Sequence, residues 1–316
     1  MKRIILLLSL LLIQANSTEI ETLKGTCGIT NKQACLELGD IYRDKHDFIQ
    51  MKRYYETACM YNEPKGCIRL AREFAKRDDG ESKFWEYRNY ADACELKSGE
   101  GCYEEAVMYV RGDGVKKDSK KAIQLYWLAS RYGYAKADIN LGNYYLQGHT
   151  VRQNFKRATE LFAKACQAGD MLGCNNLGLN YLRGAGMRPN KPKAFQLFKQ
   201  ACNGGGGEGC RNLGSCHFTG TATAKDTQKA YNTYIRSCQL NNSGGCYQAS
   251  VLLTTGDGVR QEIIKGLLFA KKACTLNHKT ACKKLSNSVS LMRQSCLRGD
   301  QDVCDKLDQY NSRSRK

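Results

Sequence analysis

The sequence predicts an all-α protein made of stacked two-helix repeats. Sixteen of the 17 cysteines form eight Cys-x7-Cys pairs, and the first cysteines of four consecutive pairs, Cys166, Cys202, Cys238 and Cys274, lie 36 residues apart. A fixed period of this length is typical of arrays of helix pairs. Within each period, apolar and small residues recur at spacings of three and four, as on one face of an α-helix.

Length and composition agree with a folded repeat protein. Of the 316 residues, 42% are hydrophobic and only 3 are proline, which excludes disordered and collagen-like chains. The 49 basic and 31 acidic residues give a net charge of +18. Such a charge favours acidic partners but does not name one.

Residues 1–17 are predicted to be a secretory signal peptide. Two basic residues precede an apolar run that ends at Ile13, and Ala15 and Ser17 suit the positions before a cleavage site. The run would span only about 15 Å as a helix, half of a bilayer core. We therefore expect a secreted chain, periplasmic or extracellular, with a net charge of 18 − 2 = +16 after loss of the two basic residues.

The first helix of each repeat is predicted directly after the second cysteine of a pair. After Cys174, for example, Leu177, Gly178 and Tyr181 lie at offsets +3, +4 and +7, which share one helical face. The glycine would let a neighbouring helix come near. The sequence Gly-Ala-Gly at 184–186 then ends this helix, because glycine adopts the left-handed conformation that terminates helices.

The second helix follows the glycine turn and ends at the next Cys-x7-Cys pair. Ala194, Phe198 and Ala201 lie at i, i+4 and i+7 just before Cys202. Within one unbroken helix, residues eight apart would be about 12 Å apart, whereas a disulfide needs Cα atoms within about 7 Å. The chain must therefore turn back between the two cysteines of each pair.

Each pair is accordingly predicted to form a disulfide that joins one hairpin to the next. The alternative is that these cysteines bind a metal. It agrees less well with the sequence, because zinc ligands usually come as C-x2–4-C and the four histidines fall in different repeats. The predicted disulfides are Cys27–Cys35, Cys59–Cys67, Cys94–Cys102, Cys166–Cys174, Cys202–Cys210, Cys238–Cys246, Cys274–Cys282 and Cys296–Cys304.

One repeat keeps the register without its cysteines. Counting 36 residues back from Cys166 leads to Ser130, whose partner position is Asp138. The predicted organisation is a signal peptide (1–17), an N-terminal cap (18–34), seven helix pairs (35–281), a C-terminal capping unit (282–305) and a basic tail (306–316). The last residues of this tail, 312–316, are expected to be frayed and solvated.

This repeat unit resembles the Sel1-like repeat, a relative of the tetratricopeptide repeat. The signal peptide and the regular Cys-x7-Cys pairs further resemble the Helicobacter cysteine-rich proteins. The resemblance departs at Ser130 and Asp138, at the extra Cys216, and at Ala249-Ser250, where the Leu-Gly step is weakened. The residues that show it most fully are Leu177, Gly178, Tyr181, Gly184, Gly186, Lys193, Ala194, Phe198, Ala201 and Cys202.

The resemblance implies a right-handed α/α superhelical solenoid in which the first helices line a concave groove. It also implies β-lactam (penicillin) binding, slow β-lactamase activity and action on host cells after secretion. The residues themselves identify no catalytic group: no serine is followed by lysine three residues later, as a serine β-lactamase would require. The alternative is a non-catalytic interaction scaffold for host or cell-envelope proteins.

If the first helices line a groove, offsets +1, +5 and +9 project into it. Amide and guanidinium groups at these positions could hold an extended peptide, a peptidoglycan fragment or a β-lactam by paired hydrogen bonds. The other interpretation is an ordinary solvated surface. The candidate groove residues are Asn143, Gln147, Asn175, Arg183, Arg211 and Tyr247.

Cys216 is the one cysteine without a partner in the pattern. We expect a buried free thiol. The alternatives are an intermolecular disulfide and a reactive thiol with His217 as its base. The second alternative has poor geometry, because neighbouring residues on a helix point about 100° apart. We expect no cofactor and no metal. Nucleic acid is not an expected partner because the basic residues gather on no single face, and a monomer is expected.

Overall fold

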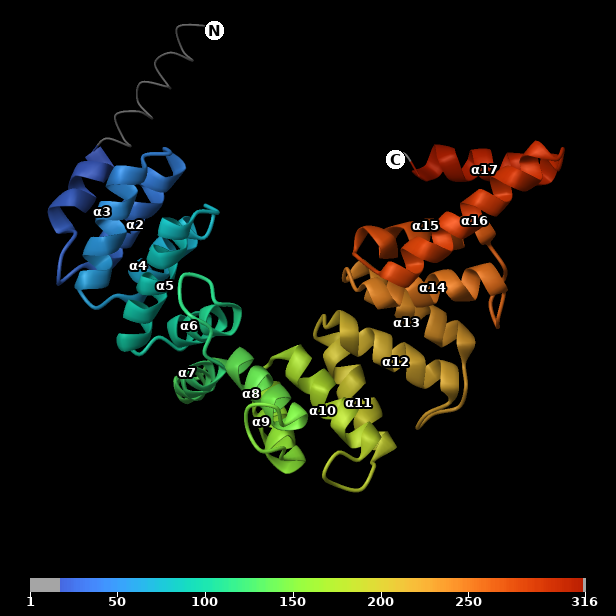
Figure 1. Ribbon diagram of the computed structural model, residues 1–316, viewed down its shortest axis with the longest axis horizontal. Coiled ribbons are helices and arrows are strands. Elements are labelled where there is room, and N and C mark those ends of the chain that lie inside the picture. Colours follow the sequence, from blue (N-terminus) through green and yellow to red (C-terminus); the bar gives the residue numbers. More distant parts are fainter. Residues whose placement is uncertain (1–17, 315–316) are drawn as a thin grey trace, which may run out of the picture. The chain divides into compact units, whose positions relative to one another are not determined.

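The computed structural model describes residues 18–314 and confirms the all-α fold class (Figure 1). The predicted signal peptide, residues 1–17, lies outside the described residues. A helical segment at 18–26 precedes α2. The following helices are α2 (Lys32–Asp44), α3 (Phe48–Met60), α4 (Pro64–Phe74), α5 (Gly80–Glu95), α6 (Gly99–Arg111), α7 (Ser119–Arg131), α8 (Ala135–Gln147), α9 (Phe155–Gln167), α10 (Met171–Arg183), α11 (Lys191–Asn203), α12 (Gly207–Thr219), α13 (Thr227–Gln239), α14 (Ser243–Thr255), α15 (Ile263–Thr275), α16 (Lys279–Leu297) and α17 (Gln301–Ser314).

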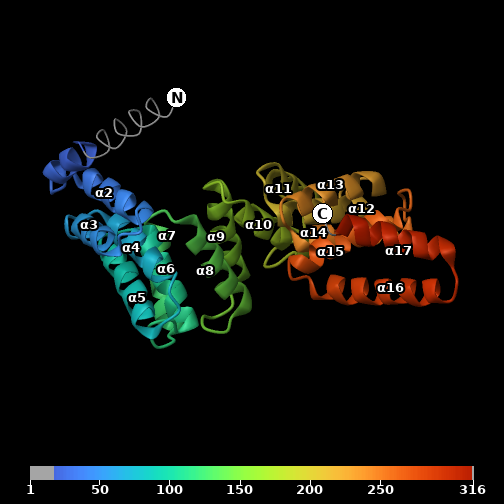
Figure 2. The same ribbon diagram turned by 90° about the horizontal axis from the view of Figure 1, so that it is seen from above.

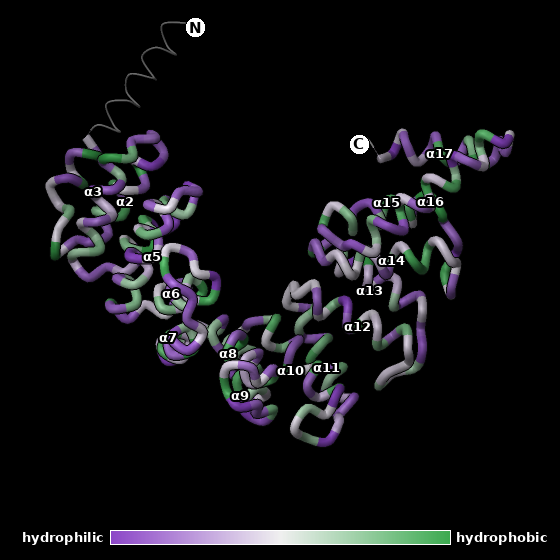
Figure 3. The backbone as a smooth tube through the Cα atoms, viewed as in Figure 1, coloured by the Kyte–Doolittle hydropathy of each residue, from purple (hydrophilic) through white to green (hydrophobic). Residues whose placement is uncertain are grey.

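Helices that follow one another in sequence pack together as hairpins. We call the even-numbered helices from α2 to α16 first helices, and the odd-numbered helices from α3 to α15 second helices. First helices pack on the second helices that follow them, as in α10 with α11 and α12 with α13. Figure 3 shows hydrophobic and hydrophilic residues alternating along these helices, as expected for amphipathic helices with one buried face.

The local structure of one repeat follows from its capping residues. The Asp170 side chain accepts hydrogen bonds from the backbone N–H groups of Leu172 (2.9 Å) and Gly173 (3.3 Å) and so begins α10. Gly184, with φ +72°, ends the same helix in the left-handed conformation. Asn190 then caps α11. The glycine turn therefore separates two well-defined helices.

Two glycines allow close helix contacts in this repeat. A Cβ atom added to Gly178 would lie 2.7 Å from the Phe198 ring, and one added to Gly173 would lie 2.6 Å from the Cβ of Ala165. Both distances are too short for carbon atoms in contact. Glycine in the Leu-Gly step thus lets α10 approach its own second helix, and Gly173 lets it approach the preceding one.

Eight disulfides join successive elements, each between cysteines eight residues apart. Cys166 at the end of α9, for example, is bonded to Cys174 near the start of α10. The Cα–Cα distances range from 4.3 to 5.1 Å. Closing such a short loop stabilises the fold by about 2.6 kcal/mol per bridge in the chain-entropy model.

A hydrogen bond occupies the place of the missing bridge. The Ser130 hydroxyl at the end of α7 donates to Asp138 Oδ1 in α8 at 2.5 Å. Both residues are buried, with 4% and 2% of their surface exposed. The polar pair therefore links these two helices at the position where other repeats have a disulfide.

The chain divides into two compact units, Met1–Leu141 and Gly142–Lys316, and the boundary falls within α8. The core of the first unit includes a cluster around Tyr55, Leu70 and Phe74. In the second unit, Phe198 packs in a cluster with Cys210 and Leu213. Each unit thus has apolar clusters of its own.

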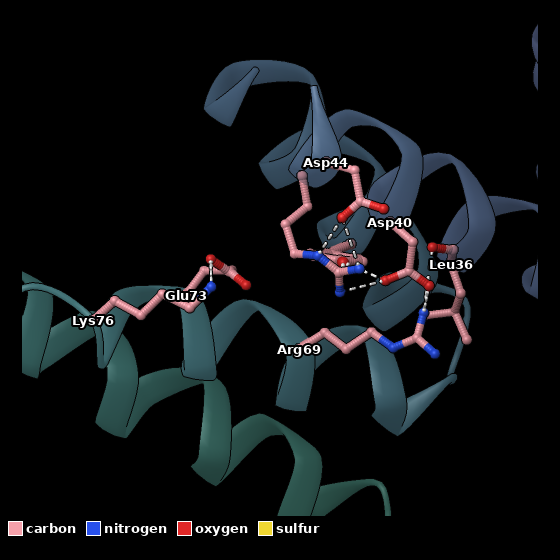
Figure 4. A network of polar contacts seen from close by, with 8 residues as sticks. Leu36, Asp40, Asp44, Arg69, Glu73 and Lys76 are labelled. Carbon is pink, nitrogen blue, oxygen red and sulfur yellow. Dashed lines mark hydrogen bonds and ion pairs between the residues drawn. The ribbon is translucent and has the colours of Figure 1, made fainter. Parts of the chain in front are cut away.

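A polar network centred on Asp40 ties α2, α3 and α4 of the first unit together (Figure 4). Asp40 in α2 accepts hydrogen bonds from Arg43 (2.8 Å), from the Tyr55 hydroxyl in α3 (2.8 Å) and from Arg69 in α4. Arg69 also donates to the Leu36 carbonyl at 3.4 Å. One carboxylate therefore supports the packing of three helices.

The predicted fraying at 312–316 is wrong for residues 312–314, which belong to α17 together with the preceding part of the basic tail. Leu307 and Tyr310 are buried, and Tyr310 packs in a cluster with Ile264 and Leu267 of α15. Figure 2 shows α17 running alongside α16, and the two helices are in contact. The apolar residues three positions apart give α17 a face that packs against α15.

Candidate functional site

The predicted groove residues all belong to first helices of the second unit. Successive first helices touch directly, since α10 contacts α12 and α12 contacts α14. Asn175, Arg211 and Tyr247 occupy equivalent positions on these three helices. We call the surface formed by α10, α12 and α14 the first-helix face.

Asn175 does not project into an open groove, so this part of the prediction is wrong. It is only 3% exposed. Its Oδ1 accepts a hydrogen bond from Asn212 Nδ2 in α12 at 2.7 Å, and its own amide nitrogen donates to Asn176 at 3.3 Å. The side chain therefore links α10 to α12 and is not available to a ligand.

Arg211 is partly exposed on α12. Its guanidinium forms an ion pair with Glu208, three residues earlier, at 2.9 Å. The same carboxylate accepts a hydrogen bond from Asn242 at 2.8 Å. Gly244 leaves room for Arg211, because a Cβ atom there would lie 2.7 Å from Arg211 Cδ. These contacts hold the guanidinium in place while part of it remains open to solvent.

Tyr247 on α14 lies between two basic side chains. Its ring stacks on the His278 imidazole with centroids 4.6 Å apart, and the Lys284 ammonium lies 5.3 Å from its centroid. Beside it is a hollow of about 120 Å³, also lined by Ser250 and Ser288. An aromatic ring, a cation and hydroxyl groups thus converge between α14 and α16, at the edge of the first-helix face.

The other three predicted residues do not join this arrangement. Gln147 and Arg183 are exposed and Asn143 is half-buried. Within residues 18–314, the side chain of none of the three forms a hydrogen bond or an ion pair. They therefore remain candidate surface positions.

The prediction missed offset +2 as a contact position. Asn212 and Lys284 lie two residues after the second cysteine of their pairs, and each reaches the +1 residue of the preceding repeat, Asn175 and Tyr247 respectively. Asn140 is in the same relation to Tyr103, with 3.4 Å between the amide nitrogen and the hydroxyl. The recurring polar residue at this offset was the available signal.

Cys216 is a free, buried cysteine. Burial raises the pKa of its thiol to about 11, so the thiolate is scarce at neutral pH. Burial also lowers the pKa of the neighbouring His217, whose Nδ1 has no hydrogen-bond partner within the described part of the chain. His217 packs edge-on against Phe195, with ring centroids 5.5 Å apart. These surroundings give a poor nucleophile.

The fold and the site define a helical-repeat protein whose hairpins are joined by disulfides. The chain belongs to the Sel1 repeat family: the family model matches residues 99–133, 135–170, 172–206, 207–242 and 243–278. Repeats of the tetratricopeptide type form extended binding surfaces, and this class of protein mediates protein–protein interaction. Comparison with curated proteins finds no significant match.

Two solved structures share the fold over most of their length. One is c5321, a protective antigen of uropathogenic Escherichia coli strains displaying an SLR fold, at 21% identity and a TM-score of 0.69, covering 93% of this chain and 67% of that one. The other is a Sel1 repeat protein from Oxalobacter formigenes, at 20% identity and a TM-score of 0.67, covering 76% and 96%.

Cysteine rich protein B of Helicobacter pylori is 34% identical over 43% of this chain and 98% of its own, with a TM-score of 0.36. The eight disulfides of this chain are typical of an oxidising compartment outside the cytosol. Among the described helices, none combines the length and the apolar character that a membrane crossing requires.

Proposed function

We propose that this chain is a secreted or periplasmic interaction scaffold that binds an extended peptide on its first-helix face. The observation that carries the proposal is the placement of Arg211 and Tyr247. They lie at equivalent positions of adjacent first helices, and both are partly exposed. The secreted location rests on the predicted signal peptide, and N-terminal sequencing of the mature protein should begin near residue 18.

The spacing of helices suits an extended ligand. Packed helices lie about 8–10 Å apart, and an extended peptide advances about 3.3 Å per residue. A peptide crossing the face would therefore meet Arg211 and then Tyr247 about three residues further along. A guanidinium binds carboxylates by paired hydrogen bonds, and a tyrosine ring offers an apolar surface with a polar tip. Peptidoglycan stem peptides, which are short and carry free carboxylates and methyl side chains, have this chemistry.

Binding of a synthetic stem peptide, L-Ala-γ-D-Glu-L-Lys-D-Ala-D-Ala, measured by isothermal titration calorimetry tests this proposal. We expect the double variant Arg211→Ala, Tyr247→Ala to bind at least tenfold more weakly. Lys199→Ala, an exposed position on the second helix α11, is the control with the same charge change as Arg211→Ala and should bind normally. Equal affinity of the double variant and the control would count against the first-helix face.

We infer β-lactam binding with slow hydrolysis as a second candidate function, implied by the resemblance to the Helicobacter cysteine-rich proteins. One observation favours it: Ser250, Ser288 and Lys284 line the same hollow beside Tyr247. A serine hydroxyl next to a lysine is a known arrangement for acyl transfer. The serine oxygen would bond to the lactam carbonyl carbon as the ring C–N bond breaks, and the lysine would carry the hydroxyl proton to the ring nitrogen.

Nitrocefin hydrolysis by protein purified from a lactamase-deficient host tests this candidate. If the hollow is responsible, Lys284→Met should remove the activity, and one of Ser250→Ala and Ser288→Ala should do the same. Lys283→Met, the neighbouring exposed lysine, is the matched control. A rate no higher than that of heat-inactivated protein would exclude hydrolysis without affecting the scaffold proposal.

A further inference from the structure

A cleft of about 460 Å³ lies between α5, α6 and α7 of the first unit. Its volume is in the range of small-molecule binding sites. It is lined by charged residues, tyrosines and leucines, and by none of the residues of the first-helix face. Nothing derived above accounts for it.

Glu105 of α6 is the unusual residue of this cleft. It is only 6% exposed, and within residues 18–314 its carboxylate has neither a hydrogen-bond partner nor an ion pair. The equivalent positions of the next three repeats are Leu141, Leu177 and Leu213. A buried carboxylate without a partner costs stability, and the repeat fold does not need one at this position.

Lys121 of α7 lines the same cleft. Its ammonium also lacks an ion pair or side-chain hydrogen bond within the described residues. Both side chains line this cleft but do not form an ion pair with each other. Burial raises the pKa of Glu105, and the charge of Lys121 opposes part of that effect. An unpaired acid and an unpaired base therefore face one space.

The remaining lining completes a small binding site. The hydroxyl groups of Tyr87 and Tyr109 are 3.1 Å apart and their rings meet edge to face, with centroids 5.7 Å apart. Leu125 and Leu128 add apolar surface. Tyrosine pairs of this kind form rigid, partly polar walls.

Two further charged residues line the cleft. Glu95 of α5 adds to the negative charge near Glu105 and raises its pKa. Arg88 of α5 is already paired with Asp92 at 3.5 Å. The charged side chains that are free to bind a ligand are therefore two acids, Glu105 and Glu95, and one base, Lys121.

We propose that this cleft binds a small zwitterion, of the size of an amino acid or dipeptide, with its ammonium at Glu105 and its carboxylate at Lys121. Such a ligand supplies the donor that Glu105 lacks and the acceptor that Lys121 lacks. The tyrosines and leucines would enclose its apolar side chains. The site is independent of the function proposed for the first-helix face.

Burial raises the pKa of Glu105 to about 7, so binding should depend on pH. An ammonium ligand requires the ionised carboxylate and therefore competes with its proton. The dipeptide affinity should rise about tenfold per pH unit below the pKa of Glu105 and level off above it.

The test is calorimetric titration of the full chain with alanyl-alanine, in its L,L and D,D forms. N-acetyl-alanyl-alanine lacks the ammonium, alanyl-alanine amide lacks the carboxylate, and N-acetylglucosamine is a neutral ligand. We expect only the zwitterions to bind. Failure of both dipeptides to bind at millimolar concentration, or preferential binding of the sugar or of either blocked dipeptide, would overturn the proposal.

Two variants separate binding from folding. Glu105→Leu introduces the residue of the neighbouring repeats, so it should fold and yet bind the dipeptide at least tenfold more weakly. Lys121→Met should also bind more weakly, whereas Lys120→Met, an exposed neighbour outside the cleft, should bind normally. Unchanged dipeptide affinity in a folded Glu105→Leu variant would refute the role of the carboxylate.

Discussion

The unpaired carboxylate of Glu105 should make the stability of the first unit depend on pH. In the folded chain the pKa of Glu105 is about 7, and burial is the main cause; the ordinary value is 4.5. At about 1.4 kcal/mol per pH unit, this difference corresponds to about 3 kcal/mol. The folded state keeps its proton where the unfolded state has lost it, so stability should fall as pH rises from 4.5 to 7 and change little beyond.

The perturbation is Glu105→Gln, which has nearly the same shape and does not titrate. The unfolding free energy of this variant minus that of the wild type should increase by about 3 kcal/mol as the pH rises from 4.5 to 8. Urea unfolding of the disulfide-intact proteins, followed by far-UV circular dichroism at several pH values, measures the difference. Glu81→Gln, at an exposed glutamate of α5, is the control.

A difference between wild type and Glu105→Gln that stays constant across this pH range would refute the reasoning. It would mean that Glu105 is ionised in the folded state at the same pH as in the unfolded chain. Direct titration of the Glu105 carboxyl carbon by NMR would then show an ordinary pKa, which would also remove the expected pH dependence of dipeptide binding.

Three further predictions concern the repeat fold. The double variant Ser130→Cys, Asp138→Cys should form a ninth disulfide. Its free energy of unfolding should increase by about 1 kcal/mol, because the loop-entropy gain of about 2.6 kcal/mol exceeds the contribution of the lost hydrogen bond. More than one free thiol on titration in denaturant would contradict this. Gly178→Ala should cost about 1–3 kcal/mol in urea unfolding because its Cβ would meet Phe198; unchanged stability would show that the ring can move. Cys216 should react with a thiol reagent only after unfolding, and rapid labelling of the folded protein would contradict its burial.

The fold could be predicted because the interactions that define it are close in sequence. The distance between Cys166 and Cys174 along the chain already requires a turn, and the glycine and aromatic positions recur in each period. Every repeat provides the same evidence again. The all-α repeat architecture therefore followed from spacing alone, and the structure and the family model confirm it.

The candidate site could be predicted only in part. Counting offsets gives the direction of a side chain around its helix, but not how closely the next first helix packs against it. Asn175 points toward α12, where Asn212 of the following repeat covers it. Glu105 was not singled out in the sequence, because one glutamate at offset +3 does not reveal that it is buried, and a partner for it could be sought only in the folded chain.

The disulfide Cys94–Cys102 joins α5 to α6 directly beside Glu105, and Cys94 lines the same cleft. Its loop-entropy contribution of about 2.6 kcal/mol is comparable with the cost of ionising Glu105. The disulfide therefore offsets the free-energy cost of the ionised Glu105 carboxylate in the same part of the fold. After reduction, this contact should open before the equivalent one at Cys166–Cys174, whose first helix carries Leu177 in place of Glu105. Hydrogen exchange of reduced protein should show earlier exchange of α6 than of α10 at pH 8, and a much smaller difference at pH 5, where Glu105 is protonated. Equal exchange of the two helices at both pH values would show that the disulfide does not compensate for the ionised Glu105 carboxylate.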